Sequence, residues 1–230
     1  MLRAVFEHQL EQLQEQLLIM SSQVEDNLVT STFALQQCDH AFSEALIAAD
    51  AQINAAYIHI EEVCLALIAT QQPRARDLRF ITAVMTIAGE LERINDYAKG
   101  VAKINLQLGH QPRPRAVSDL CCVMAEKARH MLTQSMNAFL ARDASLAYVI
   151  YAADAEIDAL YSQIQHDLLA VMLSDFHQTP QANKLMWAAH NLERAGDRVG
   201  NICERVIYLV TGELVELPTA VIMPSSPAAP

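Results

Sequence analysis

A phrase that occurs twice in this chain is the strongest constraint on how it can fold. Residues 91–96 read LERIND, and residues 192–197 read LERAGD, 101 positions later. A second pair of phrases, ADAQIN at 49–54 and ADAEID at 153–158, is separated by 104 positions. Two copies of one structural unit explain both offsets, with a connection that is three residues shorter in the second copy.

Glycine and proline usage indicates that each unit is built from helices. Only six of the 230 residues are glycine, whereas an average usage of roughly 7% would supply about 16. β-Hairpins depend on Gly, Asn or Asp at their turns, and long helices do not. We therefore predict an all-α fold.

Helical periodicity and capping signals divide the chain into six long helices. The first covers 6–37, the second is capped by Asp39 and runs to about 70, and the third starts at Pro73 and runs to about 108. After a break at 109–114, the fourth covers 117–141, Asp143 caps the fifth, and Pro180 introduces a sixth that ends near Gly212. The pattern predicts two pseudo-symmetric antiparallel three-helix bundles, residues 1–110 and 111–217, and a disordered tail at 218–230.

Charge and cysteine content narrow the class of protein. The net charge of −11 argues against a nucleic-acid partner, which requires a basic surface. No uninterrupted apolar run reaches the 18 or so residues that span a bilayer, and the N-terminus lacks a signal-peptide pattern. The five cysteines form no C-x-x-C pair, which is typical of reduced thiols in a cytoplasmic protein.

The two units carry carboxylates at matching positions, spaced so that each pair lies on one face of a helix. A three-helix bundle could bring the two pairs of a unit together, and clustered carboxylates attract cations such as Fe, Zn, Mn or Mg. His190, three residues before the last pair, is a further candidate ligand. The pairs are Asp50 with Asn54 and Glu92 with Asp96 in the first unit, and Asp154 with Asp158 and Glu193 with Asp197 in the second.

An alternative interpretation treats the same carboxylates as solvated surface positions, with Arg93 and Arg194 balancing their charge. Isolated acidic pairs are common on helices, but a pair that recurs with a matching partner helix is not. No phosphate-binding loop and no nucleophile with its base is recognisable. The E-x-x-H pattern of di-iron helices is also absent.

Together these motifs make the chain resemble the PhoU family, the phosphate-uptake regulators of bacteria. The similarity is carried by QQPRARDLRF at 71–80, LERINDYA at 91–98 and NLERAGDRVGNICE at 191–204, and it extends over about residues 5–212.

The resemblance implies metal clusters on both acidic faces and a regulatory, non-enzymatic role. It also implies partners at the inner membrane, namely the phosphate-specific ABC transporter and its sensor histidine kinase. By position, it assigns Asp50, Glu92 and Asp96 to a first metal site and Asp154, Asp158, Glu193 and Asp197 to a second, with Asn201 and Glu204 as further candidates. Asn95 stands where the family has glycine, and Asn54 removes a charge, so both departures weaken the first site.

Three hypotheses follow. The leading one is a cytoplasmic negative regulator of phosphate uptake and phosphate-starvation signalling, a metal-binding homodimer that docks on transporter and kinase without entering the membrane. The second is a helical scaffold without functional metal. The third is a metal-dependent phosphohydrolase, for which the sequence offers no base.

Overall fold

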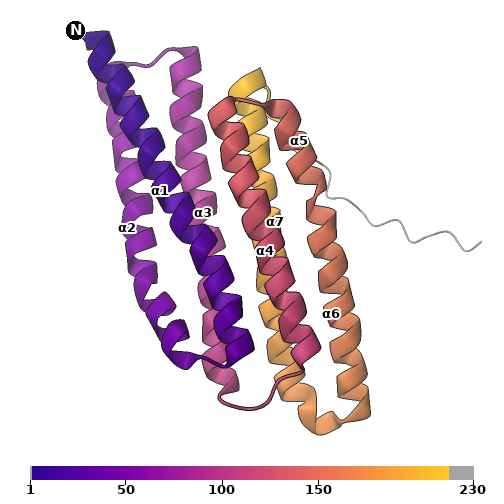
Figure 1. Cartoon of the computed structure of the whole chain (residues 1–230). Coiled ribbons are helices and arrows are strands. Elements are labelled where there is room, and N and C mark those ends of the chain that lie inside the picture. Colours follow the sequence, from indigo (N-terminus) through magenta and orange to yellow (C-terminus); the bar gives the residue numbers. More distant parts are fainter. Residues whose placement is uncertain (1, 218–230) are drawn as a thin grey trace, which may run out of the picture.

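Long helices account for nearly all of the computed structural model, which describes residues 2–217 (Figure 1). No strand occurs within these residues. The expected tail at 218–230 lies outside them. The helices are α1 (Leu2–Gln37), α2 (His40–Gln71), α3 (Ala75–Leu108), α4 (Arg115–Ala141), α5 (Ala144–Ala152), α6 (Asp154–Ser174) and α7 (Thr179–Thr211), with a 3₁₀ turn η1 (Phe176–Gln178) before α7.

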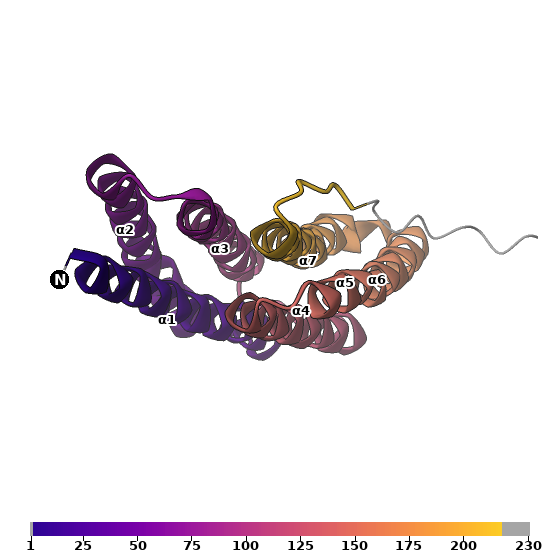
Figure 2. The same cartoon turned by 90° about the horizontal axis from the view of Figure 1, so that it is seen from above.

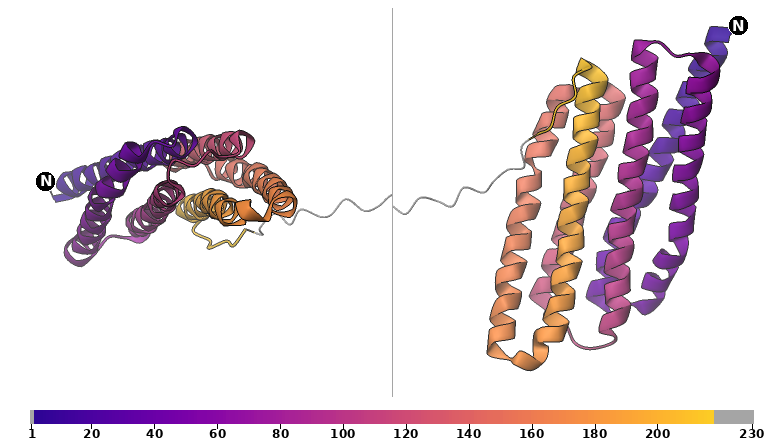
Figure 3. Two further views of the ribbon diagram at one scale, coloured as in Figure 1. Left: turned by 90° about the horizontal axis from the view of Figure 1, so that it is seen from below. Right: turned by 180° about the vertical axis from the view of Figure 1, so that it is seen from behind.

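The helices form two antiparallel three-helix bundles that lie side by side. The first contains α1, α2 and α3, and the second contains α4, α5 continued by α6, and α7 (Figures 1 and 2). The bundles meet where α3 packs on α7 and α1 packs on α4. Seen from behind, α6, α7, α3 and α2 follow one another across the molecule, with α4 and α1 beyond them (Figure 3). The predicted all-α, two-bundle fold is confirmed.

Equivalent tight turns connect the first two helices of each bundle, and they explain why Asp39 and Asp143 begin new helices. Cys38 and Arg142 adopt the left-handed conformation, with φ of 57° and 53°. The next residue is then an N-cap: the Asp39 carboxylate accepts a hydrogen bond from the Phe42 N–H, and Asp143 does the same for Leu146. Both predicted caps are confirmed.

Several helix boundaries differ from the sequence prediction: the first and fourth helices start earlier, at Leu2 and Arg115, and two further differences have a local cause. The third helix starts at Ala75 and not at Pro73, because Arg74 is extended (φ −92°, ψ 158°) and helical hydrogen bonding begins only after it. The fifth predicted helix is two helices, since the chain tightens at Ala153, whose N–H bonds to the carbonyl of Ile150, three residues earlier. The break falls directly before Asp154.

A single apolar core runs through both bundles. Leu13, Leu17, Met20 and Val24 of α1 are all fully buried, as their heptad spacing predicts. Among the described helices, α2 alone is long and apolar enough to cross a membrane by length and composition. Of the apolar stretch of α2 that meets this criterion, 22% is buried in the structure. Its placement against α1 and α3 is that of a bundle helix.

Candidate metal centre

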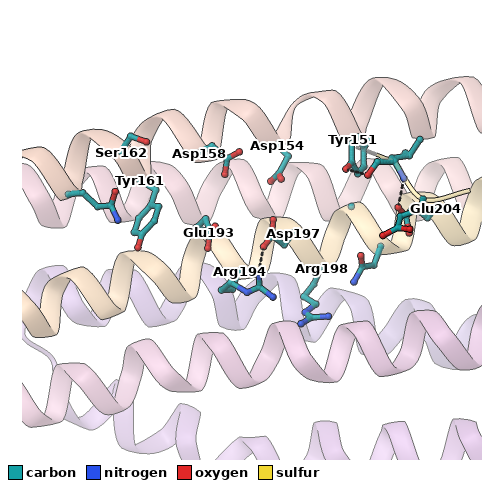
Figure 4. Close-up of a pocket in the computed structure, with 15 residues that line it drawn as sticks. Tyr151, Asp154, Asp158, Tyr161, Ser162, Glu193, Arg194, Asp197, Arg198 and Glu204 are labelled. Carbon is teal, nitrogen blue, oxygen red and sulfur yellow. Dashed lines mark hydrogen bonds and ion pairs between the residues drawn. The ribbon is translucent and has the colours of Figure 1, made fainter. Parts of the chain in front are cut away.

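The acidic residues of the second repeat surround one open cavity between α6 and α7. Asp154 and Asp158 project from α6, and Glu193 and Asp197 project from α7 toward them (Figure 4). The cavity measures about 710 Å³. The spacing of four residues places each pair on one helix face, so two adjacent helices bring all four carboxylates together. This is the juxtaposition that the sequence predicted for the second unit.

Burial and the repulsion of neighbouring carboxylates raise the pKa values of Asp154, Asp158 and Glu193. Burial, followed by the charges of Asp158, Asp197 and Glu193, raises the pKa of Asp154 to about 7. Burial and then Asp197 raise the pKa of Glu193 to about 7, against the opposing effect of Arg194. The pKa of Asp158 is raised by burial and by Asp197. Four carboxylates held this close are a strong attractor for a cation.

The residues around Asp154 fit a cation better than they fit a closed hydrogen-bond network. The Oδ1 atom of Asp154 is buried and has no hydrogen-bond partner. It lies against Gly196, where an added Cβ would come within 2.5 Å of it. The glycine therefore keeps open the space beside an unsatisfied carboxylate oxygen. All four donors are carboxylates, the ligand type preferred by hard cations.

The carboxylates are not arranged as a finished coordination shell. Within residues 2–217, no three His, Cys, Asp or Glu side chains stand together so that they could hold a metal ion as they lie. One of the four is engaged elsewhere, because Arg194 Nη1 lies 2.6 Å from Asp197 Oδ2. Metal binding would therefore require side-chain rotations, and the assignment of these residues as ligands stays a prediction.

His190 does not line the cavity. Its Nδ1 atom lies 3.3 Å from Glu193 Oε2, but neither atom has a hydrogen-bond partner among the described residues. Its ring contacts the rings of Tyr161 and Trp187.

Asn201 and Glu204, which match the family phrase, border the cavity but have other partners. The Asn201 amide donates to Glu90 on α3, so it links the two repeats. Glu204 accepts a hydrogen bond from the backbone N–H of Leu217, and Leu217 O accepts one from the Tyr151 hydroxyl. These contacts hold the segment after α7 over one end of the cavity (Figure 4).

The first repeat is different, because a lysine occupies the acidic face. Lys99 Nζ lies 2.8 Å from Asp50 Oδ2 and 2.5 Å from Asp96 Oδ1. Burial lowers the pKa of Lys99, but its hydrogen bonds to the two carboxylates outweigh that effect and the pKa is raised. The Asn95 amide donates to the other oxygen of Asp50 at 2.9 Å. Two of the three predicted ligands of the first site are therefore brought together around an ammonium group.

Glu92, the third predicted ligand of the first site, lies within electrostatic reach of Asp50, Asp96 and Lys99 and also borders a second pocket. It lines this pocket of about 340 Å³ together with Tyr57, Glu61 and Glu90. Burial raises its pKa, followed by the charge of Asp96. Sequence reasoning missed Lys99, although a signal was present: at the 101-residue offset, Lys99 corresponds to Gly200.

Known proteins are similar to this chain both in sequence and in two-repeat helical architecture. The PhoU domain matches residues 17–104 and again residues 122–206. The phosphate-specific transport system accessory protein PhoU homolog of Clostridium acetobutylicum is 35% identical over 218 residues, which cover 94% of this chain and 99% of that protein. The PhoU protein of Escherichia coli K12 is 32% identical over 212 residues, covering 90% and 86%.

Two crystal structures have the same fold as this chain. The crystal structure of the phosphate transport system regulatory protein PhoU from Streptococcus pneumoniae matches with a TM-score of 0.83 at 32% identity, over 92% of this chain and 100% of that one. PhoU from Pseudomonas aeruginosa matches equally well, over 90% and 100%. Fold and repeats thus define an all-helical accessory protein of phosphate transport. The chain belongs to the PhoU family.

Proposed function

We propose that this protein is a negative regulator of phosphate uptake and phosphate-starvation signalling, and that it acts in the cytoplasm without catalysing a reaction. It would dock on the phosphate-specific ABC transporter and on the sensor histidine kinase, and so report phosphate sufficiency. Similarity to accessory proteins of the phosphate-specific transport system over nine-tenths of the chain carries this proposal.

The second repeat would hold the metal in this proposal. Asp154, Asp158, Glu193 and Asp197 supply oxygen donors for Fe, Zn, Mn or Mg from two helices. A bound cation would supply positive charge that offsets their repulsion. With that repulsion relieved, the four side chains would tie α6 to α7 and fix the shape of the bundle face that a partner contacts. The regulator would work as a homodimer, a prediction that light scattering of the purified chain tests directly.

A deletion strain tests the regulatory role. We expect a phosphate-starvation reporter to become active in phosphate-rich medium when the gene is deleted, and to be silenced again by the wild-type gene on a plasmid. A strain complemented with Glu193→Ala/Asp197→Ala serves as the matched variant. Reporter output that is unchanged by the deletion would contradict the regulatory role. Silencing by the double variant as complete as that by wild type would favour a scaffold without functional metal.

A further inference from the structure

Three of the differences between the two acidic faces surround Asp50 in the first repeat, and they change the charge or the free space beside that carboxylate. Where the second repeat has Asp158, Gly196 and Gly200, the first has Asn54, Asn95 and Lys99. The first face therefore loses one carboxylate and gains two amides and an ammonium group. The carboxylate positions Asp50, Glu92 and Asp96 are retained opposite Asp154, Glu193 and Asp197.

Lys99 satisfies the carboxylates that a cation would otherwise join. Its Nζ atom lies within 2.8 Å of Asp50 and 2.5 Å of Asp96. The side chains of Lys99 and Asp50 are only 18% and 13% exposed, so this contact is shielded from water. The Asn54 and Asn95 amides also donate to Asp50, one to each oxygen. Every oxygen of Asp50 thus has a donor, in contrast to Asp154.

The amide of Asn95 is held in its donating orientation by the neighbouring helix. Asn27 of α1 donates to Asn95 Oδ1 at 2.8 Å. Because the oxygen of the Asn95 amide is engaged by α1, its NH₂ group faces Asp50 on α2. An amide NH₂ has no lone pair to offer a metal. The network therefore spans all three helices of the bundle. It directs N–H groups toward the place where a metal ion would need the lone pairs of oxygen or nitrogen atoms.

The second repeat lacks this arrangement for a structural reason. Gly200 occupies the position of Lys99, and an added Cβ there would lie 3.1 Å from the Tyr151 ring. Gly196 occupies the position of Asn95, and its missing side chain leaves the space beside Asp154 open. A lysine at position 200 would therefore crowd the Tyr151 ring, so the second face has no counterpart of the Lys99 ammonium beside Asp154.

We infer that the first repeat binds no metal ion and that the Lys99 ammonium is its permanent counter-ion. A divalent ion entering the first face would have to displace a shielded ion pair and then lie beside the displaced ammonium, which repels it. The first bundle is accordingly stable without metal. The inference concerns the first repeat alone and does not rest on metal binding by the second.

Metal stoichiometry after dialysis against Mn²⁺ tests the absence of a first site. We expect Glu193→Ala/Asp197→Ala to lower bound manganese to background, and further Glu92→Ala/Asp96→Ala substitution to change nothing. Adding Asn54→Asp, Asn95→Gly and Lys99→Gly to the first double variant should restore binding, to about one ion per chain. Manganese that persists in Glu193→Ala/Asp197→Ala and disappears with Glu92→Ala/Asp96→Ala would overturn the inference.

Thermal melting in the presence of chelator tests the role of Lys99. Lys99→Met leaves the shielded Asp50 carboxylate and the half-exposed Asp96 without a counter-ion, so we expect its Tm to fall by about 5 °C or more. Lys99→Arg keeps the charge and should recover most of the loss. Lys103→Met, one turn further along α3 at an exposed position, is the matched control and should melt like wild type. A Lys99→Met protein that melts like the control would overturn the counter-ion role, even if no variant binds manganese.

Discussion

At the scale of single residues, Asp154 and Glu193 make the stability of the metal-free protein depend on pH. Their folded pKa values of about 7 exceed the ordinary values of 3.8 and 4.5. Between about pH 4 and pH 7 the folded state therefore holds protons that the unfolded state has released. Because the folded state binds more protons there, stability is highest at the acidic end and falls as the pH rises through 7.

Urea unfolding in the presence of chelator checks this dependence. Wild type should lose roughly 1–2 kcal/mol more between pH 5 and pH 8 than Asp154→Asn/Glu193→Gln, a moderate figure because water screens these half-buried groups. The variant keeps the shape of both side chains and removes the titration. Equal pH profiles for the two proteins would show that these carboxylates are not the source of the dependence.

Gly196 makes a second residue-scale prediction. Its Cβ would meet Asp154 Oδ1 at 2.5 Å and Ile157 Cδ1 at 3.0 Å. Gly196→Ala should therefore displace the carboxylate and weaken Mn²⁺ binding roughly tenfold or more. Its effect on stability should stay within about 1 kcal/mol, because alanine favours the helix while the displaced contacts oppose it.

Gly89→Ala is the control for Gly196→Ala. The nearest atom to an added Cβ at Gly89 is a ring carbon of Tyr57 at 3.8 Å, an ordinary contact. This substitution should stabilise the protein by about 0.5–1 kcal/mol and leave Mn²⁺ binding unchanged. Loss of binding in both variants would point to a general effect of rigid helices and not to the space beside Asp154.

At the scale of elements, Arg113 secures the connection between the two repeats. Its guanidinium donates to the carbonyl of Leu35 in the last turn of α1, to Asn105 in the last turn of α3 and to Gly109, which caps α3. Leu35 O also accepts a long hydrogen bond, 3.4 Å, from the Cys38 N–H. Carbonyls in the last turn of a helix lack the usual partner four residues further on, and helix C-termini attract positive charge. One side chain from the linker thus closes two helix ends.

Replacing Arg113 by Met should lower the free energy of unfolding by about 1–3 kcal/mol, since charge-assisted hydrogen bonds to partly buried carbonyls are lost. Arg115→Met is the comparison. The Arg115 side chain is 91% exposed and lies 3.9 Å from Asp119, so its loss should cost under about 0.5 kcal/mol. Both values come from urea titrations, and equal values would contradict the role of Arg113 as a cap.

The elements also show what the sequence can and cannot predict. Asp39 and Asp143 were recognisable as caps because capping depends on a few neighbouring residues. The break at Ala153 was not, since alanine favours helix and the local sequence contains no signal for a tighter turn there. The pairing of Lys99 with Asp50 depends on how α2 and α3 pack. Only the comparison of the two repeats could have pointed to it, through Gly200.

At the scale of the whole molecule, the continuous core makes the two repeats one cooperative unit. The interface between α3 and α7, together with that between α1 and α4, joins the bundles along their length (Figures 2 and 3). The repeats share apolar surface in the way that a single domain does, so we expect them to unfold together. Separated repeats would expose that surface.

The sole tryptophan, Trp187 in α7, reports on the second repeat and can detect this coupling. Ile60 is fully buried on α2, a helix that packs only on α1 and α3 among the described helices. Ile60→Ala should lower the free energy of unfolding by about 2–5 kcal/mol. If the molecule is cooperative, the Trp187 fluorescence transition shifts by the full amount and coincides with the loss of helical circular dichroism.

Ile164 of α6 stands at the same position of the second repeat and is equally buried, so Ile164→Ala is the matched variant. Both substitutions should shift the Trp187 transition similarly. A Trp187 signal that responds to Ile164→Ala and not to Ile60→Ala would mean that the repeats unfold independently. Metal bound at the second face could not then stabilise the first, whereas in a cooperative molecule a ligand on either repeat stabilises the whole chain.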